Sequence, residues 1–320
     1  MGVDYASYGT PRLELGAALH EYEVSQNTFI GTKLFGVTPV TKKAANYPVV
    51  TRESLLARAD VKRAPRSAYN RTGFQTEDKA YACGEFGLEG QLDASERELY
   101  ANDFDAEMET SKDILVKLLR EQEMRVAALA FSETTFDAST VFFHTGTVWS
   151  NVASTIVADI QAAALKVFQN CGMPANTLTI SRTVLNYLLS NTDIKARIQY
   201  AQVAGWDQIK AALASLIGIP QILVGDGVYN TKPEGATAAT IGNIWTTDYA
   251  LVSIAPQAGS VIQPALGRTF LWTSDSPENV MVESYDEPQT RSTVFRVRQN
   301  VQEAVIDKFF GCLIDVAHTS

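Results

Sequence analysis

The chain has 320 residues and a formal net charge of −9, with 27 Lys and Arg against 36 Asp and Glu. This acidic balance argues against a protein that coats nucleic acid, because such proteins need a surplus of basic residues. No run reaches the roughly 18 consecutive apolar residues of a membrane span, and the N-terminal residues lack the pattern of a signal peptide. We therefore expect no membrane partner and a protein that folds where it is made.

Charge is distributed unevenly within the first third of the chain. Residues 42–71 carry eight basic side chains against two acids, and residues 77–109 carry eleven acids against two basic side chains. Residues 39–74 have no sustained helical period and contain three prolines, so they predict a long excursion from the body of the protein. The charges would suit two solvated faces of one hairpin. They would also suit an arm with one basic and one acidic limb that lies across a neighbouring copy.

The second interpretation gives a set of candidate residues for contacts between subunits. The set joins the basic side chains of the first limb to the first acids of the second: Lys42, Lys43, Arg52, Arg58, Lys62, Arg63, Arg66, Arg71, Glu77, Asp78, Glu85 and Glu89.

Regular elements follow the charged excursion. Apolar residues at three- and four-residue steps predict a helix from Glu107 to Phe131, about 37 Å long at roughly 1.5 Å per residue. Helices and short strands then alternate over residues 149–255, with Ser181 as a helix cap and a stop at Gly172. The last strands predicted are at residues 268–273, 280–285, 292–299, 301–307 and 311–317. The fold class predicted is α+β.

No motif in the sequence marks an active site. It has no P-loop, no nucleotide-binding GxGxxG, no GxSxG elbow, no CxxC pair and no HxxxH spacing. The best catalytic set that can be assembled is Cys171, His144 and Asp159, and nothing in their spacing brings them together. Asp226, between two glycines, is more typical of a turn than of a metal loop. We expect no enzyme, no metal site and no cofactor.

The order of these parts resembles the major capsid proteins of tailed bacteriophages, which share the Hong Kong 97-type capsid fold. The likeness is clearest in the middle of the chain. There the sequence combines a helix from Trp149, a turn at Pro174-Ala175-Asn176, a strand ending in Ser181, a Leu-rich helix, the segment Ile194-Lys195-Ala196-Arg197-Ile198, and a strand begun by Ile219-Pro220.

The resemblance implies a division of the chain into five segments. These are an N-terminal arm at residues 1–30, an extended E-loop at 31–94, a peripheral domain with a long spine helix at 95–148, an axial α/β domain at 149–255, and further peripheral strands at 256–320.

The resemblance also implies a function and a set of partners. The chain would self-assemble into hexamers and pentamers of an icosahedral shell around double-stranded phage DNA, held without sequence specificity. A separate scaffolding protein, a portal and decoration proteins would be its other partners. It would assemble in the host bacterial cytoplasm and reside in the virion. Two alternatives remain: the shell of an encapsulin-like nanocompartment, and a cytosolic hydrolase.

Overall fold

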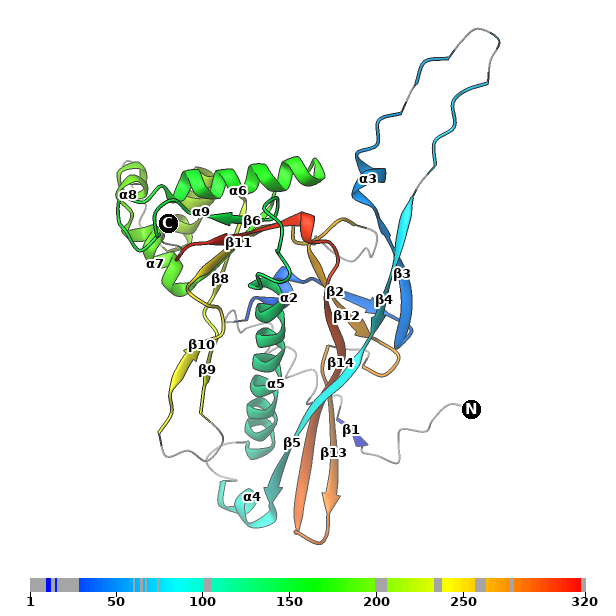
Figure 1. Ribbon diagram of the computed structural model, residues 1–320. Helices are drawn as coiled ribbons and strands as arrows, with labels where there is room; N and C mark the ends of the chain where they lie inside the picture. Colours follow the sequence, from blue (N-terminus) through cyan, green and yellow to red (C-terminus); the bar gives the residue numbers. More distant parts are fainter. Residues whose placement is uncertain are drawn as a thin grey trace.

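The computed structural model describes residues 10–12, 15, 29–59, 61–63, 66, 68–73, 75–100, 105–198, 206–232, 238–256, 263–276 and 279–317. These residues form two packed units and one long hairpin (Figure 1). Of the expected N-terminal arm, residues 1–30, only residues 10–12, 15, 29 and 30 belong to the described part. Within these ranges no helix has the length and apolarity needed to cross a membrane.

The first unit, called here the six-stranded unit, is a mixed sheet covered by one long helix. Its strands lie in the order β1 (Thr10–Pro11), β13 (Met281–Glu287), β14 (Ser292–Val305), β12 (Gly267–Trp272) and β2 (Val37–Val40), and β5 (Gly84–Asp93) also pairs with β14. Helix α5 (Ala106–Ala130) packs on β14 and β5, with Ile114 and Leu118 in one core with Phe295 and Val297. The short helix α4 (Ala94–Tyr100) joins β5 to α5.

The predicted long helix is confirmed to within one residue at each end. Its apolar stripe is buried against the sheet, which explains why the three- and four-residue spacing is so regular. Asp105 begins it, because its carboxylate accepts hydrogen bonds from the backbone N–H groups of Glu107 and Met108 at 3.1 and 3.2 Å.

The second unit, the five-stranded unit, is an α/β layer at the other end of α5. Its strands lie in the order β6 (Phe142–His144), β15 (Gly311–Asp315), β11 (Tyr249–Ser253), β7 (Thr177–Ser181) and β8 (Gln221–Gly225). Its helices are α6 (Ile156–Cys171), α7 (Arg182–Ser190), α8 (Thr192–Ile198) and α9 (Trp206–Ile217). The predicted cap is confirmed: the Ser181 hydroxyl accepts the N–H of Val184 at 3.4 Å. A small hairpin of β9 (Val228–Asn230) and β10 (Ile241–Asn243) leaves this unit beside α5 (Figure 1).

Two strands lie in a different unit from the one predicted. The segment 311–317 was expected to complete the domain of the long helix, and residues 95–148 were assigned to that domain as a whole. Instead β15 pairs with β11 and β6 in the five-stranded sheet. Cys312, Leu313 and Ile314 are fully buried, because β15 is flanked by a strand on each side and covered by α6.

Three smaller expectations also need correction. The extended E-loop implied at residues 31–94 does not begin at residue 31, because residues 31–34 form the short helix α2 (Gly31–Leu34) and residues 37–40 are strand β2 of the six-stranded sheet. Trp149 was placed in a helix, but α6 begins only at Ile156, and the Trp149 indole N–H donates to Asp159 in the first turn of that helix at 2.9 Å. The two strands predicted at 292–299 and 301–307 are one continuous strand, β14.

A single carboxylate joins the two units. Glu123 of α5 is 2% exposed and accepts the backbone N–H of Ile30 at 3.0 Å, that of Gly31 at 2.6 Å and the indole N–H of Trp245 at 2.6 Å. Trp245 lies between β10 and β11 of the five-stranded unit, whereas Ile30 and Gly31 lead into α2 and β2. Residue 31 must be glycine here, because a Cβ atom would lie 2.6 Å from the carboxylate oxygen. Glu123 therefore ties together three parts of the chain.

We predict that Glu123→Gln destabilises the protein by about 1–3 kcal/mol, because the amide replaces one acceptor and leaves a buried donor without a partner. Burial raises the pKa of Glu123 above its ordinary value of 4.5, so the folded chain holds this proton to a higher pH than the unfolded chain does. The stability that this group contributes is therefore present below pH 4.5 and is lost as pH rises through the raised pKa.

Urea unfolding of both proteins across this pH range measures the effect. The difference in the free energy of unfolding between the wild type and Glu123→Gln should shrink as pH rises. Glu121→Gln on the exposed side of the same helix is the control and should change little. Equal losses in the two variants, or a difference that does not depend on pH, would contradict the assignment.

Candidate functional site: the charged hairpin

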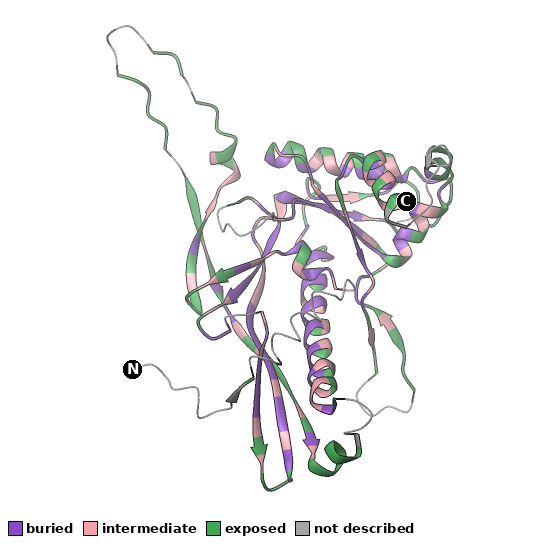
Figure 2. Ribbon diagram, turned by 180° about the vertical axis from the view of Figure 1, so that it is seen from behind, coloured by how far each residue is buried: buried purple, intermediate pink, exposed green. Residues whose placement is uncertain are grey.

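A long hairpin projects away from both units (Figure 1). Strands β3 (Ala44–Val50) and β4 (Thr76–Ala82) pair antiparallel, with Ala44 opposite Ala82 and Val50 opposite Thr76. The chain continues beyond them through a single helical turn, α3 (Arg52–Leu55), to a distal end. Along most of its length the hairpin is exposed, drawn green in Figure 2. In the part of the chain that is described, its far half has no core of its own.

The base of the hairpin is anchored by aromatic packing on the six-stranded unit. Tyr47 and Tyr81, one from each limb, lie 5.0 and 4.7 Å from the ring of Phe270 on β12, measured between ring centroids. The Tyr81 hydroxyl donates to the carbonyl of Lys42 at 3.1 Å, and burial raises the pKa of both tyrosines. These anchors were not predicted, although tyrosines placed among small and polar residues in two flanking extended segments were a usable signal.

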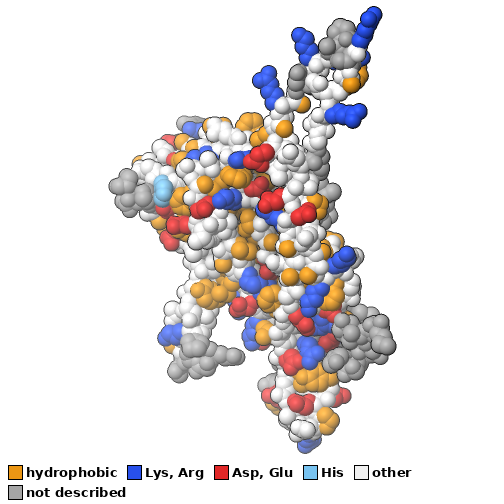
Figure 3. Space-filling model, turned by 45° about the vertical axis from the view of Figure 1, so that its right-hand side comes forward, with side chains coloured by type: hydrophobic (Ala, Val, Ile, Leu, Met, Phe, Trp, Pro, Cys, Tyr) orange, Lys and Arg blue, Asp and Glu red, His pale blue; other side chains and the backbone are white. Residues whose placement is uncertain are grey.

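The distal end of the hairpin is strongly basic. Its exposed side chains include Arg58, Lys62, Arg63, Arg66 and Arg71, and Figure 3 shows Lys and Arg side chains spread around this end. The Arg63 guanidinium lies 4.7 Å from the ring centroid of Tyr69, itself 74% exposed. Residues 54–76 carry five basic side chains and one acid, Asp60, so this end has a net positive charge.

The remaining candidates lie nearer the body, and they do not form one acidic limb. Glu77 and Asp78 are exposed on β4, directly across from Val49 and Pro48. Lys42 and Lys43 flank the base, with Lys43 Nζ 5.5 Å from the Trp272 ring centroid. The acids after residue 82 leave the hairpin altogether, because β5 pairs over its full length with β14 in the large sheet. The predicted arm with one basic and one acidic limb is therefore wrong in this respect.

The opposite charges are instead separated between the hairpin end and the body of the protein. Exposed acids follow one another along α4 and the first turns of α5: Glu96, Glu98, Asp105, Glu109 and Asp113. Three acids of this stretch are paired within the chain: Glu107 with Arg97 and Arg12, Glu109 with Lys112, and Asp113 with Lys117. In Figures 1 and 2 the hairpin leaves one side of the molecule, whereas α4 and β9–β10 lie toward the opposite side.

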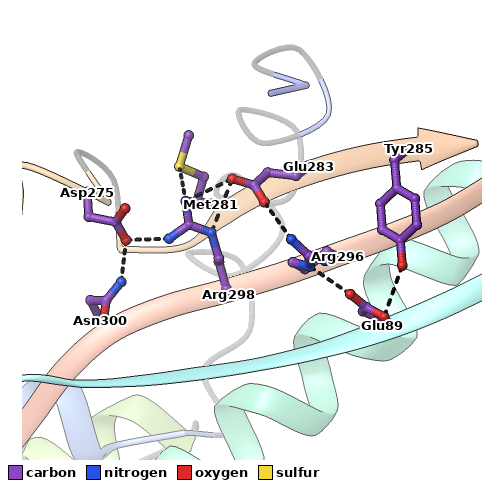
Figure 4. Close-up of polar contacts among 8 residues, drawn as sticks. All are labelled: Glu89, Asp275, Met281, Glu283, Tyr285, Arg296, Arg298 and Asn300. Carbon is purple, nitrogen blue, oxygen red and sulfur yellow. Dashed lines mark hydrogen bonds and ion pairs between the residues drawn. The ribbon is translucent and has the colours of Figure 1, made fainter. Parts of the chain in front are cut away.

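Glu89, one of the predicted contact residues, is occupied within its own chain (Figure 4). Its carboxylate accepts Arg296 Nε at 2.7 Å and the Tyr285 hydroxyl at 3.2 Å. Arg296 also contacts Glu283, which accepts two hydrogen bonds from the nearly buried Arg298 at 2.8 and 3.2 Å.

Arg298 is held on its other side by Asp275, which also accepts the amide of Asn300. Breaking a buried pair of this kind typically costs about 3–5 kcal/mol, because the remaining charge stays buried without a partner. This network stabilises the sheet. It also gives the Glu89 carboxylate its partners within the chain, so no contact with a neighbouring subunit is needed to explain its position. Glu85 is exposed on the same strand.

The side chains of the hypothetical catalytic set have separate structural roles. The Cys171 thiol donates to the carbonyl of Val167 at 3.0 Å, and burial raises its pKa, which disfavours the nucleophilic thiolate. His144 is exposed and pairs with Asp315 at 3.1 Å, while Asp159 accepts the indole of Trp149. Asp226 pairs with Arg182 at 2.6 Å. Among the described residues no group of three His, Cys, Asp or Glu could hold a metal ion.

The structure has clear likenesses among solved proteins. A phage-related protein from Bordetella bronchiseptica RB50 matches with a TM-score of 0.74 and 21% identity, over 98% of this chain and 99% of that one. The capsid protein of cyanophage P-SCSP1u matches with a TM-score of 0.60 and 14% identity, over 89% and 87% of the two chains. An encapsulin from Synechococcus elongatus matches with a TM-score of 0.53 and 13% identity, over 90% and 89%.

Comparison of the sequence alone gives less. No family model matches the chain, and no curated protein matches it at a significant level. The structural likeness nevertheless extends over nearly the whole chain and includes several phage capsid proteins. The protein therefore has the fold of the tailed-phage major capsid proteins, the Hong Kong 97-type capsid fold.

Proposed function

We propose that this protein is the repeating subunit of a phage capsid. One observation carries the proposal: a chain with this capsid fold holds out a long basic hairpin that has little to pack against in its own subunit. Ordering a backbone costs about 1–2 kcal/mol per residue, so contacts from outside the chain must compensate for the extended conformation. A second copy of the same chain is the partner that the charge distribution favours.

The positions of the charges fit a head-to-tail association. The basic end of the hairpin leaves one side of the subunit, and the acids of α4 and α5 lie toward the opposite side. Contacts between unlike faces of identical subunits close into rings when the rotation between neighbours is right. Opposite charges at such a contact fix the register and disfavour wrong pairings. Arg58, Lys62, Arg63, Arg66 and Arg71 are the residues we assign to it.

The finer features of the proposal follow the capsid fold. The rings are hexamers and pentamers of an icosahedral shell around double-stranded phage DNA, assembled in the host bacterial cytoplasm with a scaffolding protein and a portal. Decoration proteins would bind the finished shell from outside. The net charge of −9 suits a container, because a basic lining would hold the packaged DNA tightly.

The shell of an encapsulin-like nanocompartment is the second candidate. The observation that favours it is the match to the Synechococcus elongatus encapsulin, which covers almost as much of the chain as the cyanophage capsid protein does. Both candidates need the same assembly chemistry from the hairpin. They differ in what the particle contains.

Electron microscopy of the purified protein, together with its sedimentation profile, tests the proposal. Closed shells, tubes or free hexamers and pentamers are expected. Nuclease-protected DNA in particles from infected or induced cells would support the phage capsid, whereas one co-purifying protein inside would support the nanocompartment. A small oligomer that stays unassembled with scaffolding protein present would contradict both.

We further predict that reversing Arg58, Lys62, Arg63 and Arg66 to Glu abolishes shells and leaves a folded subunit. The four side chains are exposed, so the fold does not depend on them. Like charges facing each other at an interface cost several kcal/mol, so shell yield should fall by about tenfold or more. Circular dichroism checks the fold and sedimentation measures the shells.

The matched control exchanges the same four residues for the other basic residue: Arg58→Lys, Lys62→Arg, Arg63→Lys and Arg66→Lys. This variant keeps the charge and should assemble. Normal shells from the reversed variant would show that the basic end is not an assembly contact.

A further inference from the structure

The hairpin approaches its own five-stranded unit at α3. This helix is one turn long, and Thr51 begins it by accepting the N–H of Ser54 at 3.3 Å. None of its four residues is buried, so its position is not fixed by a core. It nevertheless lies against the C-terminal part of α6, next to η3 (Lys308–Phe310), the single turn that precedes β15.

Two contacts hold α3 in this position. The Arg52 guanidinium lies over the ring of Phe309, 4.0 Å from its centroid, and pairs with Glu53 at 3.6 Å. Leu56 packs over Gly172, where a Cβ atom would lie 3.0 Å from Leu56 Cδ2. Gly172 also has a φ of +73°, the left-handed conformation that ends α6, so two requirements favour glycine there.

The return limb adds a third contact beside the first two. Lys79 of β4 donates from Nζ to the carbonyl of Ile306 at 2.6 Å, just before η3. Asp307 follows it and accepts the N–H of Phe309 at 2.9 Å. Both limbs of the hairpin therefore meet the same short segment, residues 306–309, which joins β14 to β15.

The space between these contacts is hollow. A pocket of about 360 Å³, open to solvent, lies between the hairpin and residues 305–309, lined among others by Val50, Arg52, Lys79, Asp307 and Phe309. A few polar and edge contacts around a cavity resist displacement less than a close-packed interface does, because the lining atoms have no partners to lose. The aromatic anchor of Tyr47 and Tyr81 on Phe270 lies closer to the base of the hairpin than α3 does and would remain in place.

We propose that α3 is a releasable latch that sets the angle between the hairpin and the five-stranded unit. With Arg52 on Phe309 and Leu56 on Gly172, the hairpin is held in the direction seen here. Without these contacts it pivots about the aromatic anchor at its base. If the hairpin joins subunits, as the proposed function requires, its angle helps to set the angle between neighbours and hence the curvature of the shell.

The direct test measures the hairpin angle inside one subunit. Spin labels are placed at Val61→Cys, 90% exposed on the hairpin, and at Gln161→Cys on the exposed side of α6; the three native cysteines are buried. Labelled chains are diluted with unlabelled chains, so that distances between the two labels of one chain dominate the signal in pulsed electron paramagnetic resonance. The latched protein should give one narrow distance distribution, and Arg52→Ala should broaden it and shift its mean.

Two further variants keep the test decisive. Phe309→Leu removes the ring from the opposite side of the contact while keeping an apolar side chain, and it should reproduce the effect of Arg52→Ala. The double variant should add little to either single one. Arg197→Ala removes an exposed guanidinium from α8, outside the hairpin, and should leave the distribution unchanged. Identical distributions in the wild type, Arg52→Ala and Phe309→Leu would overturn the latch.

The particle gives a second, separable readout. Shells from Arg52→Ala should vary more in diameter than wild-type shells, whereas Arg197→Ala shells should not. A broadened distance distribution in a protein that forms no shells would support the latch and contradict the proposed function. Uniform shells from Arg52→Ala, together with an unchanged distance distribution, would support the proposed function and contradict the latch.

Discussion

The arrangement of the molecule depends on one buried carboxylate. Glu123 lies in the last third of the long helix, and its side chain is buried. Its carboxylate accepts hydrogen bonds from backbone N–H groups at the start of α2 and from the indole N–H of Trp245. A buried acid is tolerable only when such donors surround it. The direction of α5 relative to the five-stranded unit, and the point where the chain enters β2, are both fixed by this cluster.

The hairpin contrasts with this well-satisfied centre. It is attached at its base by two tyrosines that pack on Phe270 and, nearer its distal end, by α3. The described side chains from residue 57 to residue 73 are exposed. Its distal end has a net positive charge, while exposed acids follow one another along α4 and the first turns of α5 on the body of the subunit. A subunit whose centre is well packed, and whose projecting hairpin has little to pack against in its own chain, is typical of a protein that completes its contacts by joining copies of itself.

The parts of this fold that could be predicted from the sequence are those set by local spacing. The three- and four-residue spacing of the apolar residues predicted α5, and Ser181 as a capping residue predicted the start of α7. The hairpin followed from its prolines and its charge. What could not be predicted depends on partners distant in the chain. The place of β15 is decided by strands 62 and 171 residues earlier, because Leu313 pairs with Leu251 and with Phe142. The acids after residue 82 were misplaced because nothing local shows that β5 pairs with β14.

The structure of the assembled particle, determined by electron cryomicroscopy at side-chain resolution, tests the central claim most directly. The account predicts that the hairpin of each subunit crosses onto an adjacent copy, with the basic side chains between residues 58 and 71 within about 4 Å of that copy's carboxylates. A particle in which the hairpin packs only on its own chain, or in which its basic end faces open solvent, would contradict the account.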